Sequence, residues 1–227
     1  MIDFKGTPFP TAMILHAVAF YVRYAVPHRD LEEITAERGV TVDHATLNRW
    51  IVKFSPQLAK IAQSRKHVTA NSWPMDETCI RVRCKGTYLY RAVDPDGQTL
   101  DVTPSGRPDL PTARRFFKLT TGTNGVPVRG VIDKGCANLA GLMAVNEILK
   151  ITGAGRIGTI RQIKDLSYVL EQAHRFIKRI IGLTMGLKAF HFAAATLSGF
   201  HVAPMIRKKQ FPDKGISAFR QFAALAS

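Results

Sequence analysis

The spacing of apolar positions predicts three helices near the start of the chain. Within residues 10–24, apolar side chains recur three or four positions apart, which is the period of one helix face. Pro27 ends this helix, and residues 29–38 carry a second, shorter helical pattern. Asp43 begins a third helix, because its carboxylate can accept a hydrogen bond from a backbone amide of the first turn.

The second and third helices have the pattern of a helix-turn-helix, with Gly39 in the connection. In that motif the second helix enters the major groove of DNA. The apolar face of residues 47, 51 and 54 leaves four side chains near the helix start as candidates for contacts to bases or phosphates: His44, Thr46, Asn48 and Arg49. A small three-helix bundle with a solvated polar face has the same pattern, so a purely structural role stays open.

After residue 71 the pattern changes to short β-branched and aromatic runs separated by turn residues, which is typical of strands. Three consecutive runs predict antiparallel strands over residues 75–82, 87–93 and 98–102. Helices and strands then alternate over residues 111–119 (helix), 126–132 (strand), 136–150 (helix), 159–163 (strand) and 169–197 (helix). The order βββαβαβα predicts an α/β (α+β) fold with a mixed sheet flanked by helices.

These patterns divide the chain into four predicted segments. They are an all-α helix-turn-helix domain over residues 1–60, a linker over 61–71, a sheet domain over 72–200 and a basic tail over 201–227. The hydrophobic content of 46% favours a folded chain over a disordered one.

The charge of the chain points to a polyanionic partner. Thirty-two Lys and Arg against seventeen Asp and Glu give a net charge of +15, and residues 150–227 hold thirteen of the basic residues with three acidic ones. A field of this sign attracts nucleic acid, from which bound counterions are released on binding. Solubility or contact with a membrane surface are the alternative explanations of the charge.

Cysteine, histidine and hydropathy patterns narrow the class further. The three cysteines form no Cys-x-x-Cys pair and the seven histidines no zinc-ligand spacing, which favours a reducing compartment and no zinc site. The longest apolar stretch, residues 12–22, is too short to span a bilayer and lacks the features of a signal peptide. We therefore expect a cytoplasmic protein that does not enter the membrane.

Three acidic residues fall where a metal site on a sheet could form. Asp76 lies within the first predicted strand, Asp133 ends the fourth, and Glu171 is near the start of the last helix. Hard cations such as Mg²⁺ take oxygen ligands of this kind. Each also has an ordinary explanation, as an edge-strand polar residue, a turn residue and an (i, i+4) partner of Arg175 respectively. Spacing alone does not decide between the two.

Longer motifs carry a resemblance to a known family. The segments 72–78 (Ser-Trp-Pro-Met-Asp-Glu-Thr), 88–94 (Tyr-Leu-Tyr-Arg-Ala-Val-Asp) and 171–175 (Glu-Gln-Ala-His-Arg) resemble insertion-sequence transposases of the DDE class. The chain is most similar to the small, cointegrate-forming bacterial subfamily. The likeness runs in order from residues 4–6 to residues 205–208, so it covers nearly the whole chain.

The resemblance implies a ribonuclease-H-like catalytic domain, which agrees with the element order read from the pattern. It implies Asp76, Asp133 and Glu171 as catalytic residues and metal ligands, holding two Mg²⁺ ions or Mn²⁺ in their place. Glu77 is the rival for the first position, but side chains alternate along a strand, so only one of the pair can face a given site. Three basic residues share the helix face of Glu171 and could position phosphates: Arg175, Lys178 and Arg179.

The same resemblance implies double-stranded DNA partners, namely the inverted repeats at the element ends and the target. Bringing two ends together implies at least a homodimer, acting near the bacterial nucleoid. The chain departs from the family pattern at Pro74, Ser167, Tyr168 and Ala173. Because neighbouring residues tune metal sites, two alternatives stay open: a catalytically degenerate or domesticated DNA-binding protein, and a nuclease without strand transfer.

Overall fold

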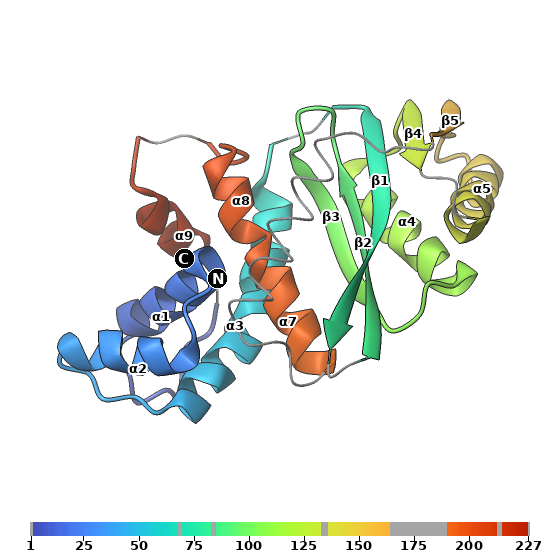
Figure 1. Ribbon diagram of the computed structural model, residues 1–227. Helices are drawn as coiled ribbons and strands as arrows, with labels where there is room; N and C mark the ends of the chain where they lie inside the picture. Colours follow the sequence, from blue (N-terminus) through green and yellow to red (C-terminus); the bar gives the residue numbers. More distant parts are fainter. Residues whose placement is uncertain are drawn as a thin grey trace. The chain divides into compact units, whose positions relative to one another are not determined.

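The computed structural model describes residues 2–67, 70–82, 85–132, 136–163, 190–212 and 215–226, which form two compact units. One unit combines the described residues of Met1–His67 with those of Ile177–Ser227, and the other consists of the described residues within Val68–Phe176. Figure 1 shows helices in the first unit and a sheet with helices in the second. Within the described ranges, no helix combines the length and apolar composition that a membrane crossing requires.

The helical unit begins with the three helices that the sequence predicts. They are α1 (Thr11–Tyr24), α2 (His28–Glu37) and α3 (His44–Arg65), with Asp43 as the N-cap of α3. The third helix is longer than expected, because it continues through Pro56. A proline in a helix interior removes one backbone hydrogen bond. Burial of Leu58 and Ala62 in the following turns offsets that loss.

A close helix crossing joins the two ends of the chain within this unit. Helix α7 (Phe190–Phe200) packs on α3, and a Cβ atom added at Gly199 would lie 2.7 Å from the Cβ atom of Ser55. Only glycine allows the two backbones to approach this closely. The Phe200 ring stacks on Tyr21 of α1, with ring centroids 5.7 Å apart. The core of the unit therefore depends on residues separated by most of the chain.

The segment expected to be a basic tail forms two helices, α8 (Val202–Arg207) and α9 (Ala218–Ala226). Both bury apolar side chains, among them Met205, Ile206, Phe222 and Leu225. Arg65 of α3 donates a hydrogen bond from Nη1 to the Ala224 carbonyl oxygen, 2.7 Å away. The predicted boundary between residues 200 and 201 thus differs from the compact units, which group α7, α8 and α9 with α1, α2 and α3.

The second unit contains a five-stranded mixed sheet. Its strands are β1 (Ser72–Val82), β2 (Lys85–Val93), β3 (Thr99–Ser105), β4 (Arg129–Ile132) and β5 (Thr159–Gln162). They lie in the order β3-β2-β1-β4-β5; β1, β2 and β3 pair antiparallel, whereas β4 and β5 run parallel to β1. The predicted mixed sheet is confirmed.

Two helices, α4 (Leu110–Asn124) and α5 (Cys136–Ile151), pack with one face of this sheet around a common core (Figure 1). The strands contribute Trp73, Met75, Tyr90 and Ala92 to this core, and the helices contribute Phe116, Phe117 and Leu142. The helices touch closely, since a Cβ atom at Gly141 would lie 2.6 Å from that of Ala113. Packing in this core thereby holds β1 and β4 in place on the face of the sheet that α4 and α5 cover.

Candidate active site

The alternation of side chains along β1 separates Asp76 from Glu77. Asp76 is the cross-strand partner of Arg91, whereas Glu77 is the partner of Tyr90. Both carboxylate residues are partly exposed, and Asp76 Oδ1 accepts a hydrogen bond from the Glu77 backbone N–H at 2.7 Å. Because Tyr90 belongs to the core under α4 and α5, Glu77 points to that face and Asp76 to the opposite one.

The chemical setting of Glu77 supports this assignment. The phenol of Tyr90 is in the core, and burial, followed by the negative charge of Glu77, raises its pKa above the usual range. The Glu77 carboxylate therefore interacts electrostatically with a residue of the core. Of the two carboxylates, Asp76 is the one on the face of the sheet opposite the α4–α5 core.

Arg91 is a buried cation directly across from Asp76, and it was not among the sequence-predicted site residues. It is 3% exposed, and its Nη2 donates to Thr99 Oγ1 at 3.3 Å. Burial lowers the pKa of Arg91 to about 10, so the guanidinium stays charged at neutral pH. The side chains of directly opposed residues start about 5 Å apart at Cβ. The sequence motif contains Arg91, but only the strand register reveals that it faces Asp76.

Strand β4 ends next to this position. Its last residue, Ile132, is the partner of Met75, the residue before Asp76. The predicted residues that follow in the chain lie outside the described residues: Asp133, Glu171, Arg175, Lys178 and Arg179. In the part of the chain that the structure describes, no group of three or more His, Cys, Asp or Glu could hold a metal ion.

The four predicted DNA-contacting residues lie in the first turns of α3, away from its buried face. His44, Asn48 and Arg49 are exposed and Thr46 is partly exposed. Arg49 Nη2 donates to Thr46 Oγ1 at 3.1 Å, and Glu32 of α2 accepts hydrogen bonds from the backbone N–H and the Nδ1 of His44. These contacts order three of the four side chains, namely His44, Thr46 and Arg49.

The N-cap of α3 is itself well defined. Asp43 accepts a hydrogen bond from the Thr46 backbone N–H, and this bond lowers the pKa of the Asp43 carboxyl from its ordinary value. The start of the helix is thereby fixed, and with it the direction in which residues 44–49 project.

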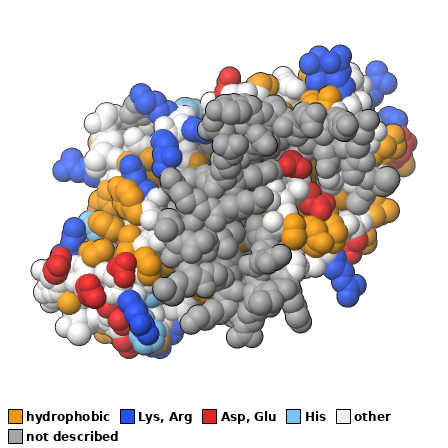
Figure 2. All heavy atoms as spheres, viewed as in Figure 1, with side chains coloured by type: hydrophobic (Ala, Val, Ile, Leu, Met, Phe, Trp, Pro, Cys, Tyr) orange, Lys and Arg blue, Asp and Glu red, His pale blue; other side chains and the backbone are white. Residues whose placement is uncertain are grey.

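A second basic surface was missed by the sequence analysis. Arg129, Arg156 and Arg161 are all exposed, on β4, before β5 and on β5. Figure 2 shows Lys and Arg side chains at this end of the sheet. Arg129 and Arg161 are far apart in the sequence, and the pairing of β4 with β5 brings them to one part of the surface.

The chain is similar in sequence to a family of known proteins. Residues 70–210 match the DDE domain of the family DDE_Tnp_IS240. The chain is 33% identical over 175 residues to the Staphylococcus aureus "Transposase for insertion sequence-like element IS431mec", covering 77% of this chain and 76% of that protein. The identity and coverage are the same for the S. aureus "Transposase for insertion sequence element IS257 in transposon Tn4003".

The chain belongs to the DDE family of insertion-sequence transposases. Enzymes of this class are metal-dependent nucleotidyl transferases. Among solved structures, the catalytic core domain of HTLV-2 integrase in complex with magnesium is similar at 16% identity, with a TM-score of 0.42, over 60% of this chain and 86% of that one.

Proposed function

We propose that this transposase binds the inverted repeats at the ends of its element and cuts and joins DNA strands with divalent metal held by Asp76, Asp133 and Glu171. The observation that carries the proposal is the position of Asp76. It lies on the sheet face away from the α4–α5 core, one residue beyond the point where β4 ends. Asp133 directly follows that strand in the sequence.

The donor chemistry of Asp76 fits a divalent cation of the Mg²⁺ or Mn²⁺ type. A partly exposed carboxylate on a sheet offers the hard oxygen ligand that such ions prefer. When bound, two such ions would activate the attacking oxygen and stabilise the leaving oxygen of an in-line phosphoryl displacement. The protein's own part is to hold Asp76 on a rigid strand and to bring phosphates beside the carboxylates.

Basic residues supply the phosphate contacts in this proposal. Arg175, Lys178 and Arg179 follow Glu171 at helical spacing, and the exposed arginines of β4 and β5 extend the positive surface of the sheet unit. Handling two element ends calls for at least two copies of the chain, so we expect a homodimer or larger assembly on DNA.

The direct test incubates purified protein with labelled element-end DNA in Mg²⁺, in Mn²⁺ and in EDTA, and separates the products on denaturing gels. Nicked and joined products that require metal support the transposase. DNA binding without cleavage would instead support the degenerate DNA-binding protein, and cleavage without joining would support the nuclease.

We assign recognition of the element ends to α2 and α3, the two helices of the predicted helix-turn-helix. The exposed side chains at the start of α3 project together, and Arg49 carries the charge. Replacing Arg49 with Gln is expected to weaken binding of element-end DNA about tenfold, because one cationic contact is lost. Fluorescence anisotropy at several salt concentrations measures this effect.

Lys60→Gln is the matched control, since Lys60 is an exposed cation on the same helix about 17 Å further along its axis. A loss confined to one base-pair position assigns Arg49 to a base. A uniform loss, with a salt slope smaller by about one, assigns it to a phosphate. Equal effects of the two substitutions would contradict a recognition role for the start of α3.

A further inference from the structure

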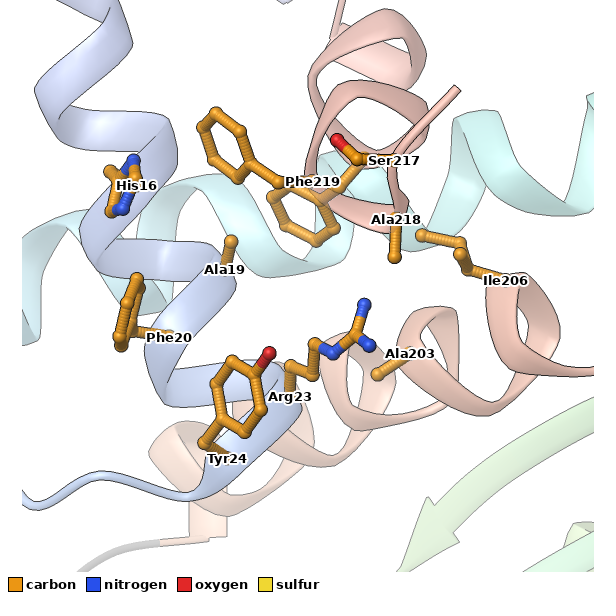
Figure 3. Close-up of a pocket in the computed structure, with 11 residues that line it drawn as sticks. His16, Ala19, Phe20, Arg23, Tyr24, Ala203, Ile206, Ser217, Ala218 and Phe219 are labelled. Carbon is orange, nitrogen blue, oxygen red and sulfur yellow. The ribbon is translucent and has the colours of Figure 1, made fainter. Parts of the chain in front are cut away.

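The helical unit contains a cavity of about 390 Å³ that neither the catalytic site nor the start of α3 uses. It is bordered by α1, α8 and α9, and Figure 3 shows side chains from these elements turned toward it. Its volume lies in the range of about 300–1,000 Å³ that small-ligand pockets occupy. The aromatic side chains that line it are His16, Phe20, Tyr24, Phe219 and Phe222.

Four of these rings form a continuous series from α1 to α9. His16 stacks on Phe20 with centroids 4.9 Å apart and an interplanar angle of 23°, and it also contacts Phe219 at 4.4 Å. Phe20 in turn contacts Tyr24 at 5.5 Å. Tyr24 is 57% exposed, so the series reaches from the wall of the cavity to solvent. Such a surface offers flat faces to another planar ring.

The charge of the cavity is positive. The Arg23 side chain extends from α1 toward Ala203 and Ala218 in Figure 3, and its guanidinium carbon lies 5.3 Å from the Tyr24 ring centroid. No acidic residue is among the described residues that line the cavity. A ligand with an anionic group next to its ring would therefore meet a cation at this wall.

His16 contributes an aromatic ring to the cavity wall but no positive charge. Its Nε2 accepts a hydrogen bond from Arg38 Nη1 at 2.8 Å, which requires the neutral imidazole. Burial, and then the charge of Arg38, lower the pKa of His16. The aromatic wall is thus neutral at pH 7, and the cation within the cavity is Arg23.

We propose that this cavity binds a single unstacked nucleobase of DNA between the aromatic side chains of α1 and α9, with Arg23 contacting the adjoining phosphate. Aromatic rings beside a guanidinium are the groups on which proteins stack bases of single-stranded nucleic acid. The net charge of +15 attracts a polyanion, and Arg23 gives the cavity a cation that an anionic ligand can contact and a purely apolar one cannot. The proposal rests on the proposed function only in that DNA is the polymer bound.

The test uses the full-length protein in EDTA, so that strand cleavage cannot contribute. The probes are a five-nucleotide single strand with 2-aminopurine at its centre and the same strand with a central abasic site. We expect the 2-aminopurine fluorescence to be quenched on binding and the abasic strand to bind about tenfold more weakly, which is the size of one base-stacking contact.

Substitutions then connect this difference to the cavity. Tyr24→Ala and Phe219→Ala are expected to weaken binding of the 2-aminopurine strand about tenfold and to leave the abasic strand unchanged, whereas Arg23→Gln weakens both. Tyr24→Phe keeps the ring and should restore binding. Because Tyr24 is mostly exposed, its replacement tests the site without disturbing the core.

Lys118→Gln, an exposed cation of α4 in the other unit, is the control for charge. Equal affinity of wild-type protein for the two strands would overturn the proposal, as would an equal effect of Tyr24→Ala on both. These outcomes are independent of the metal-dependent cleavage assay. A protein that cleaves element ends but ignores the abasic site would therefore keep the proposed function and lose this inference.

Discussion

Replacing Asp76 with Asn is expected to lower metal-dependent cleavage of element-end DNA by about 1,000-fold. The substitution keeps the shape of the side chain but removes the charge that would hold the cation in the proposed site, and a bound metal contributes several kcal/mol to phosphoryl transfer. Asp133→Asn and Glu171→Gln are expected to have effects of the same size. Single-turnover cleavage of labelled DNA measures the rate, and anisotropy shows whether DNA binding is kept.

The neighbouring residue provides a sharp control for this prediction. Glu77→Gln removes an equal charge one residue away, but Glu77 is the cross-strand partner of Tyr90 and points to the α4–α5 core. We expect this variant to retain cleavage within a few-fold of wild type. If Glu77→Gln abolished cleavage and Asp76→Asn did not, the assignment of the first catalytic carboxylate would be reversed.

Phe117→Ala is expected to destabilise the sheet unit by about 3–5 kcal/mol. Phe117 is 1% exposed in the core between the helices and the sheet, and truncating a buried aromatic ring loses its burial and leaves a cavity. Leu119→Ala, two residues further along the same helix, is the matched control. Its side chain is 47% exposed, so its replacement should cost no more than about 0.5 kcal/mol.

The two tryptophans of the chain allow each unit to be followed separately. Trp50 lies in the helical unit and Trp73 in the core of the sheet unit. In a Trp50→Phe background, the fluorescence of Trp73 during urea unfolding reports on the sheet unit alone. Similar midpoints for Phe117→Ala and Leu119→Ala would contradict the assignment of Phe117 to the core.

The elements and their order could be predicted from the sequence because periodicity is a local property. The apolar positions of α1 and α3 repeat at helical spacing, and the strands are separated by turn residues. Asp43 was correctly placed as the cap of α3, since its hydrogen bond spans only three residues. Strand β1 begins at Ser72 instead of residue 75, because Trp73 is buried and Pro74 pairs with Val131 of β4.

Features that depend on residues far apart could not be predicted in the same way. The opposition of Asp76 and Arg91 follows from the register of a hairpin, and a shift of one residue would have put Arg91 on the other face. The packing of α9 depends on contacts with α1, α3 and α8, and the basic composition around it suggested a tail. The carboxylates Asp133 and Glu171 were assigned through resemblance, and their assignment stays a prediction.

The division of the helical unit between the two ends of the chain sets an order for its synthesis. During translation α1, α2 and α3 leave the ribosome long before α7, whose Gly199 fills the crossing with Ser55. The core of the helical unit therefore stays incomplete until α7, α8 and α9 have been synthesised. A product that stops after the sheet unit would lack that core, so we expect prematurely terminated copies to be degraded before they can interfere with the intact protein.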